Sequence, residues 1–123
     1  MLIVDDEPSI VLSLEFLMKN EGYDVAAARN GKEALQRAAE FQPHLVLLDA
    51  MMPEINGFDV CEKLRGDRRQ QGLRILLLTA RGRRQEVERG LQAGADAYVT
   101  KPFATRELVE RVRELLGDEK ENT

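Results

Sequence analysis

The sequence predicts an α/β fold in which helices cover both faces of a parallel sheet. Short apolar runs alternate along the chain with longer segments whose apolar residues recur at helical spacing. This alternation is typical of parallel sheets, because a helix carries the chain back over the sheet between neighbouring strands. Four of the apolar runs also end on side chains that can bind metal or phosphate, at Asp5, Asp49, Thr79 and Lys101. The carboxyl ends of parallel strands share one edge, where ligands of open α/β folds bind.

Five short apolar segments are predicted to form the strands. They are residues 2–4, 24–28, 45–48, 75–78 and 97–99. The third is apolar throughout, which favours a central strand buried on both faces. The second contains alanines and an aspartate, which favours an edge position.

Five segments with helical spacing are predicted to form the helices. They are residues 8–22, 31–41, 57–64, 84–93 and 105–116. Pro8 suits the first position of a helix, and the apolar residues of each segment lie on one stripe that would face the sheet. The fourth helix has a thin apolar face of Val87, Leu91 and Ala93. Its internal Gly90 costs about 1 kcal/mol relative to alanine, so this helix is predicted to be the weakest.

Length and composition predict one small soluble domain. The 123 residues suit a single core, assigned here to residues 1–117, and the polar tail 118–123 is predicted to be disordered. The net charge is -4, and the arginine clusters are interleaved with acids and lack aromatic partners, so we expect no direct binding to nucleic acid. No apolar stretch approaches the ~20 residues that cross a bilayer, so no membrane contact is expected. The single cysteine, Cys61, fits a reducing cytoplasm.

Three aspartates at the predicted sheet edge indicate a metal site. Two carboxylates about 4 Å apart repel by ~4 kcal/mol at an effective dielectric constant of 20, so Asp5, Asp6 and Asp49 together need a cation. Mg²⁺ suits such a site, because it binds one or two carboxylates and completes its shell with water and phosphate oxygens. In the alternative interpretation, Asp5 and Asp6 only stabilise the start of the first helix. That alternative leaves Asp49 unexplained.

Lys101 and Thr79 supply groups that bind anions. An ammonium group can contact one phosphoryl oxygen and a threonine hydroxyl can donate to another. Either residue alone would be read as an ordinary surface lysine or a strand-ending threonine. Together with aspartates on other strands, they favour phosphoryl transfer, which needs little beyond positioning and charge neutralisation.

These residues resemble a known family. Over nearly its whole length the chain is similar to the receiver domain of two-component response regulators, the CheY-like domains. The resemblance rests on Asp5-Asp6, on Asp49 with the following Ala-Met-Met-Pro and Gly57, on Thr79-Ala80, and on Lys101-Pro102-Phe103. It implies a flavodoxin-like sheet with strand order 2-1-3-4-5.

The resemblance also implies roles for individual residues. Asp49 would accept a phosphoryl group from a sensor histidine kinase or a histidine phosphotransfer protein, with Lys101 and Thr79 contacting that group. Mg²⁺ would be held by Asp6, Asp5, Asp49 and the backbone carbonyl of Met51. Thr79 and Tyr98 would form a switch pair that changes the surface of the fourth helix, fifth strand and fifth helix. Such a domain is not an enzyme, although it assists its own phosphorylation and dephosphorylation.

Two other functions are compatible with parts of the pattern. Phosphatases of the haloacid dehalogenase type also use a strand-borne aspartate, but they usually carry a second aspartate two residues later, where this chain has Met51. A flavodoxin-like nucleotide binder would need a glycine-rich loop after the first strand, where acids stand instead. The sequence leaves open whether the protein is a stand-alone receiver or part of a longer regulator or kinase.

Overall fold

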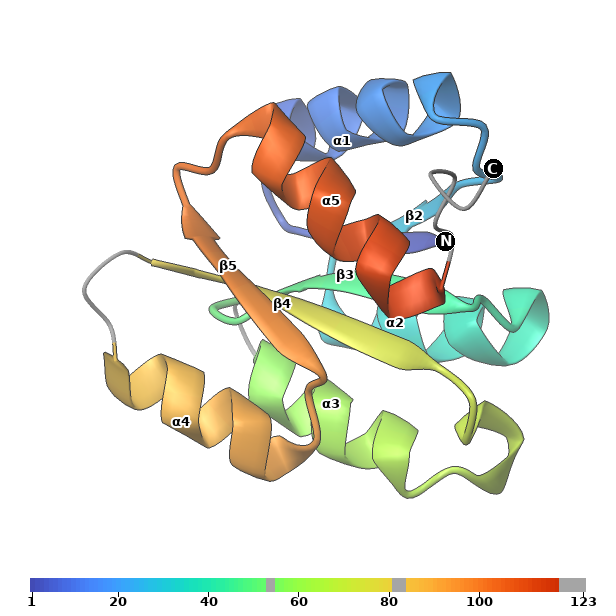
Figure 1. Cartoon of the computed structure of the whole chain (residues 1–123). Coiled ribbons are helices and arrows are strands. Elements are labelled where there is room, and N and C mark those ends of the chain that lie inside the picture. The colour runs from blue at the N-terminus through green and yellow to red at the C-terminus, as the bar shows by residue number, and fades with distance from the viewer. Residues whose placement is uncertain (53–54, 81–83, 118–123) are drawn as a thin grey trace.

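The fold is a five-stranded parallel sheet with helices on both faces (Figure 1). The computed structural model describes residues 1–52, 55–80 and 84–117. The strands are β1 (Leu2–Val4), β2 (Ala26–Ala28), β3 (Leu45–Asp49), β4 (Arg74–Ala80) and β5 (Ala97–Lys101). Their order in the sheet is β2-β1-β3-β4-β5, which confirms the predicted architecture, the central third strand and the second strand at an edge.

Two layers of helices enclose this sheet. The helices are α1 (Pro8–Asn20), α2 (Gly31–Phe41), α3 (Gly57–Arg65), α4 (Arg84–Ala93) and α5 (Thr105–Leu116), with a short 3-10 helix η1 (Arg68–Gln70). In Figure 1, α1 and α5 lie on one face, whereas α2, α3 and α4 lie on the other. None of the helices in the described ranges is long and apolar enough to cross a membrane.

The sheet divides the hydrophobic core into two halves. Successive residues of a strand point to opposite faces, so Leu47 and Leu76 pack beneath α1 and α5, whereas Leu48 and Leu77 pack beneath α2, α3 and α4. All four of these side chains are fully buried. The two continuous apolar strands therefore supply both cores at once.

Local side chains define where several helices begin and end. Asn30 accepts a hydrogen bond from the Glu33 amide at 2.8 Å, and Asn56 accepts one from the Asp59 amide at 3.0 Å. Each of these side chains satisfies a donor that the first turn of a helix leaves unpaired. Gly117 ends α5 with a φ of 71°, a backbone conformation that favours glycine. The predicted disordered tail after Gly117 lies outside the described residues.

Several local predictions differ from the structure, and among them β2 begins two residues later, and α1 ends two residues earlier, than expected. β4 and β5 extend further than expected, so that Thr79 and Lys101 lie inside paired strands instead of after them. The polar connector 65–72 contains η1, whose buried Gln70 donates from Nε2 to the Ala38 carbonyl at 2.9 Å. The prediction that Leu91 faces the core is wrong, because its side chain is 47% exposed and Gly90 is buried in its place.

Gly90 brings α4 into close contact with the sheet. A Cβ atom at this position would lie 2.0 Å from Cδ1 of Leu77 and 3.6 Å from Cε1 of Phe58. The residue that the sequence marked as a weakness is therefore the one that allows α4 to pack against β4.

The first testable prediction concerns this contact. Alanine normally stabilises a helix interior by about 1 kcal/mol over glycine, but overpacking costs typically 1–3 kcal/mol. We expect Gly90→Ala to lower the free energy of unfolding by about 1–2 kcal/mol, measured by urea denaturation. Adding Leu77→Ala should make the double variant more stable than the sum of the two single changes predicts.

Gly66→Ala provides a matched control. A Cβ atom at Gly66 would come no closer than 3.5 Å to another atom, and its backbone is helical. This change should leave the stability unchanged or raise it slightly. A Gly90→Ala variant as stable as Gly66→Ala would contradict the packing described here.

Candidate functional site

Polar side chains from four strands meet at one edge of the sheet. Asp5 follows β1, Asp49 ends β3, Thr79 lies near the end of β4 and Lys101 ends β5. Asp49 is paired in register with Leu78, and Thr79 with Thr100. The hydrogen-bonded ladder therefore places Thr79 one position, and Lys101 two positions, beyond the level of Asp49 at the carboxyl ends of the strands.

The three aspartates form one cluster. Asp5, Asp6 and Asp49 each offer a carboxylate oxygen, and these oxygens lie within 4.8 Å of one another. Asp5 is fully buried, Asp49 is 7% exposed, and Asp6 is exposed. Asp5 Oδ1 accepts from the Glu7 amide at 3.0 Å, and Asp49 Oδ1 accepts from the Met51 amide at 3.3 Å. Two of the acids are thus held in place by the turns that follow their strands.

Lys101 binds the two buried acids. Its Nζ lies 3.0 Å from Asp5 Oδ2 and 3.5 Å from Asp49 Oδ1. Burial of Lys101 opposes its charge, but the hydrogen bond to Asp5 and the charges of Asp49 and Asp5 outweigh burial and raise its pKa. Lys101 is therefore a charged ammonium group that partly neutralises the cluster.

This neutralisation is incomplete at Asp49. Burial and then the charge of Asp5 raise the Asp49 pKa from 3.8 to about 6, although Lys101 and the Met51 amide act in the opposite direction. The carboxylate is ionised at neutral pH but destabilised. A further cation would relieve that cost, and a set of three carboxylates is a donor set that suits a hard divalent ion. The residues present therefore fit a metal ion.

Thr79 presents a buried hydroxyl group at the same edge. The residue is 2% exposed, and its Oγ1 has no hydrogen-bond partner among the described residues. Most buried polar groups in proteins are paired, because an unpaired one loses its bonds to water without replacement. A ligand oxygen bound at this edge would supply the missing partner.

Gly57 brings α3 against the backbone of Asp49, a contact that motif reasoning did not explain. A Cβ atom at Gly57 would lie 2.3 Å from the Asp49 carbonyl oxygen, and the Gly57 amide donates to the Ala50 carbonyl at 3.0 Å. Only glycine fits here. The sequence signal that could have predicted this contact is a glycine eight positions after the aspartate that ends a strand.

The remaining predicted site residues lie at the margin. The Met51 side chain is 56% exposed, and Tyr98 is 40% exposed in β5, opposite Leu77. The structure therefore brings together Asp5, Asp6, Asp49 and Lys101. It places Thr79 on the adjoining strand end and leaves the Tyr98 ring partly in solvent.

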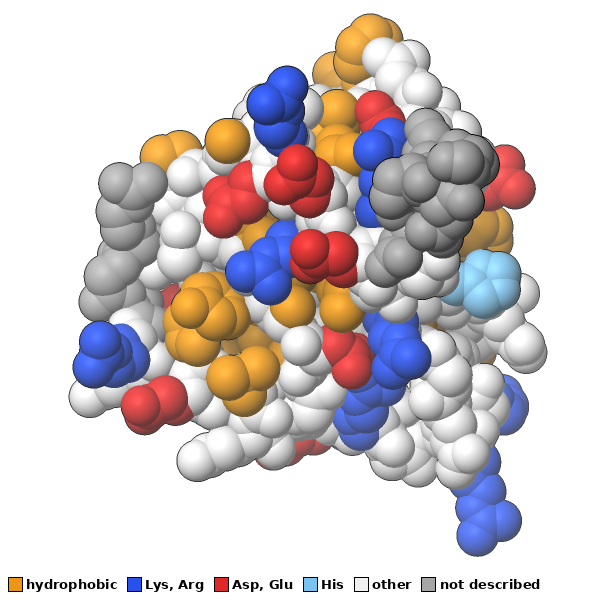
Figure 2. All heavy atoms as spheres, viewed as in Figure 1, with side chains coloured by type: hydrophobic (Ala, Val, Ile, Leu, Met, Phe, Trp, Pro, Cys, Tyr) orange, Lys and Arg blue, Asp and Glu red, His pale blue; other side chains and the backbone are white. Residues whose placement is uncertain are grey.

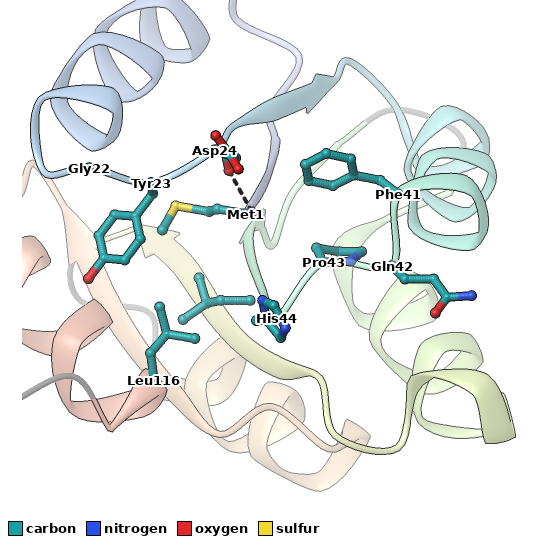
Figure 3. Close-up of a pocket in the computed structure, with 10 residues that line it drawn as sticks. Met1, Gly22, Tyr23, Asp24, Phe41, Gln42, Pro43, His44 and Leu116 are labelled. Carbon is teal, nitrogen blue, oxygen red and sulfur yellow. Dashed lines mark hydrogen bonds between the residues drawn. The ribbon is translucent and has the colours of Figure 1, made fainter.

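A hollow separate from the acidic site lies at the opposite edge of the sheet (Figure 3). This cavity of about 490 Å³ is lined by Tyr23, Phe41 and His44, among others, and the Met1 amine donates to the Asp24 carbonyl there at 2.8 Å. Its described lining includes a single carboxylate and no lysine or arginine. It therefore has no part in the acidic site.

The raised pKa of Asp49 yields a prediction about stability. The folded protein binds this proton more tightly than the unfolded chain, so ionisation of Asp49 destabilises the fold as pH rises from about 4 to about 6. One pKa unit corresponds to about 1.4 kcal/mol, and partial exposure reduces that figure. Without divalent ions, we expect Asp49→Asn to be more stable than the parent by about 1–2 kcal/mol near pH 7.5 and equally stable near pH 4.

Urea denaturation at several pH values, with EDTA present, measures this difference. Glu40→Gln removes one negative charge from an exposed position on α2 and serves as the control. Its effect on stability should be small at every pH. A gain for Asp49→Asn that persists unchanged at low pH would contradict the assigned electrostatic cause.

Several curated relatives are similar in sequence to this chain over about half of their own length. MtrA of Mycolicibacterium smegmatis is 47% identical over 112 residues, which cover 91% of this chain and 48% of the relative. RpaA of Synechocystis is 43% identical, covering 94% of this chain and 48% of that protein. PhoP of Bacillus subtilis is 45% identical over a match that covers 94% of this chain and 47% of that protein. The chain thus spans about half the length of the curated relatives it matches.

These relatives correct one expectation. MtrA and RpaA are named as DNA-binding regulators, so the prediction of no direct nucleic-acid binding is contradicted. That prediction relied on the charge and arginine spacing of these 123 residues, which describe only the matched part of the relatives. The alternative of a haloacid dehalogenase-type phosphatase finds no support among these relatives.

Solved structures agree with the sequence relatives. A structure from Chloroflexus aurantiacus superposes with a TM-score of 0.91 at 38% identity, covering 94% of this chain and 95% of the other. A CheY-like response regulator receiver domain protein from Methanospirillum hungatei superposes with a TM-score of 0.88 at 31% identity. The match covers 99% of this chain and 96% of the other. The family model for the response regulator receiver domain matches residues 1–113. With the strand order and the acidic sheet edge, these matches show that the chain belongs to the response regulator receiver domain family.

Proposed function

We propose that this receiver domain is a phosphoacceptor switch in which Asp49 takes a phosphoryl group from a phosphohistidine. The observation that carries the proposal is the position of the Asp49 carboxylate. It lies among two other acids and 3.5 Å from the Lys101 ammonium group, at the edge where the Thr79 hydroxyl has no partner within the described part of the chain. A carboxylate in these surroundings is both a nucleophile and a group that gains from binding a phosphoryl group and a cation.

The transfer needs few protein groups. An Asp49 carboxylate oxygen attacks phosphorus, the phosphorus–nitrogen bond breaks, and the imidazole leaves with the bonding electron pair and takes up a proton. Lys101 moves from the Asp49 carboxylate to a phosphoryl oxygen, and the Thr79 hydroxyl donates to another. Positioning and charge neutralisation are the main requirements of such a reaction.

The acids are proposed to hold Mg²⁺. Asp6 and Asp49 would ligate the ion directly, Asp5 directly or through water, and the Met51 carbonyl would add a further oxygen. A bound Mg²⁺ would offset the charge of the carboxylates and of the phosphoryl oxygens. The cluster of carboxylate oxygens within 4.8 Å supports this assignment.

The donor is proposed to be a sensor histidine kinase or a histidine phosphotransfer protein, with the receiver assisting its own phosphorylation and dephosphorylation. Exposed apolar side chains on α1 would help a helical donor to dock. Leu12 is 68% exposed and Phe16 is 70% exposed, and the groove beside Phe16 continues to Phe103, next to the cis Lys101–Pro102 bond. Ser9 and Phe103, which line this groove, lie close in sequence to Asp6 and Lys101.

The output is proposed to pass through the face formed by α4, β5 and α5. Movement of Thr79 toward the phosphoryl group would make room for the ring of Tyr98 to turn inward. Figure 2 shows hydrophobic, acidic and basic side chains mixed on this face, and Leu91 and Tyr98 are its exposed large apolar residues. In the whole protein, a DNA-binding effector in the cytoplasm is the proposed target, because relatives about twice as long are named DNA-binding regulators.

A first experiment tests the acceptor. With Mg²⁺ and acetyl phosphate, intact-mass spectrometry should show one phosphoryl adduct on the parent protein and none on Asp49→Asn. Asp59→Asn, an acid in the first turn of α3, is the control and should be labelled like the parent. Labelling of Asp49→Asn, or full labelling of the parent in EDTA, would rule out the assignment.

A second experiment separates metal-binding from phosphate-binding roles. Asp6→Ala should abolish Mg²⁺ binding because it removes a direct ligand. Lys101→Ala should leave Mg²⁺ affinity intact or raise it, because the change removes a cation that lies 3.0 Å from Asp5 and 3.5 Å from Asp49. Titration calorimetry of both variants measures the difference. Equal loss of binding in the two variants would show that the roles are misassigned.

A further inference from the structure

The carboxyl-terminal end of α4 is fixed by one arginine from α3. Arg65 donates from Nε to the Gly94 carbonyl at 2.7 Å and from Nη1 to the Leu73 carbonyl at 2.6 Å. Its Nη2 forms an ion pair with Asp96. One planar guanidinium thus joins the end of α3, the segment before β4 and the turn between α4 and β5.

The backbone around this turn reinforces the attachment. Asp96 also accepts from the Ile75 amide at 2.7 Å, and its own amide donates to the Ile75 carbonyl at 2.9 Å. Gly94 has a φ of 110°, and a Cβ atom there would lie 2.5 Å from Cγ of Arg65. The Arg65 clamp, meaning Arg65 with Gly94, Leu73 and Asp96, therefore depends on glycine at position 94.

The amino-terminal part of α4 is attached differently. None of residues 84–89 is buried, and the first buried residue of the helix is Gly90. Arg89 contributes a surface contact, with its guanidinium carbon 4.4 Å from the centroid of the Phe58 ring. The close contact of Gly90 with Leu77 and the clamp beyond Ala93 therefore both lie towards the carboxyl-terminal end of α4.

We propose that α4 pivots about the Arg65 clamp, so that its amino-terminal part changes position while its carboxyl-terminal end stays fixed. Thr79 and Ala80 end β4 on the side where α4 begins, whereas the clamp lies at the other end of the helix. Displacement of Thr79 thus reaches α4 at its less buried end. The clamp resists displacement at the other end, because charge-assisted hydrogen bonds in several directions are strong. The tight contact at Gly90 lies near the fixed end, so a pivot displaces it less than it displaces the residues that begin α4.

This inference rests on the proposed phosphoacceptor function for its trigger, and paired distance measurements test it. Two double-cysteine variants carry the spin labels. One replaces Gln36 on α2 and Gln85 on α4, and the other replaces Gln36 and Gln92 on α4; all three positions are exposed. Burial raises the pKa of the native Cys61 thiol to about 11, so labelling at neutral pH spares it. Pulsed electron paramagnetic resonance then gives each distance distribution with and without Mg²⁺ and beryllofluoride, a mimic of the acyl phosphate.

A pivot predicts a shift in the 36–85 distance on addition of beryllofluoride and no shift in the 36–92 distance. In the free protein, the 36–92 distribution should also be the narrower of the two. Shifts of equal size at both positions, or a shift at 36–92 alone, would overturn the pivot.

Arg65→Met and Arg69→Met form the matched pair of variants. Arg65→Met removes the clamp and should broaden the 36–92 distribution even in the free protein. Arg69→Met removes an exposed arginine that pairs with Asp67 in its own loop and should leave both distributions unchanged. Arg65→Lys keeps the charge but cannot reach three partners at once, so it should behave like Arg65→Met. An unchanged 36–92 distribution in a folded Arg65→Met variant would overturn the role of the clamp.

Fluorine NMR follows the binding of beryllofluoride separately. Failure of the parent protein to bind it would count against the proposed function. The width of the 36–92 distance distribution, compared between the free parent protein and free Arg65→Met, would still decide whether the Arg65 clamp fixes the end of α4. The two failures are therefore distinguishable.

Discussion

The constraint on which the structure depends is the repulsion among carboxylates at one edge of the sheet. Asp5 is fully buried and Asp49 nearly so, and the hydrogen-bonded register of the strands leaves them little freedom to separate. Lys101 offsets part of this charge from the end of β5. Hydrophobic burial in the two cores must supply the rest, so folding energy maintains a site that is electrostatically unfavourable without its ligands. Such a balance between stability and function is common at functional sites.

Close backbone packing extends this constraint away from the acids. Gly57 lets α3 begin directly against Asp49, and Arg65 at the other end of α3 binds the turn after α4. Between them, Phe58 lies beneath Gly90 and Arg89. α3 therefore connects the strand that ends at Asp49 to the helix whose surface is proposed to carry the signal.

The sequence predicted the sheet well because its signals were strong and local. Continuous apolar runs identified β3 and β4, and helical periodicity identified α2, α4 and α5 with the bounds that the structure shows. The site aspartates were accessible to the same reasoning, since the ends of parallel strands must meet. Periodicity failed at Leu91, because the buried contact of α4 is made by Gly90, a residue with no side chain to register in an apolar pattern.

Contacts between distant segments could not be predicted in this way. The hydrogen bond from Gln70 to Ala38 joins residues 32 positions apart, and that from Arg65 to Gly94 joins residues 29 apart. Both side chains lie in a stretch whose composition indicates only a polar connector. An argument from the charge of these 123 residues was also contradicted, because relatives about twice as long are named DNA-binding regulators.

The division of the core by the sheet affects how this domain can change in evolution. Side chains beneath α1 and α5 do not touch those beneath α2, α3 and α4, because the backbone of the sheet lies between the two groups. Substitutions at well-separated sites without shared partners have nearly additive effects on stability. Residues on α1 can therefore diversify to suit one partner without forcing compensating changes around α4, and the surfaces of these two helices can acquire their specificities independently.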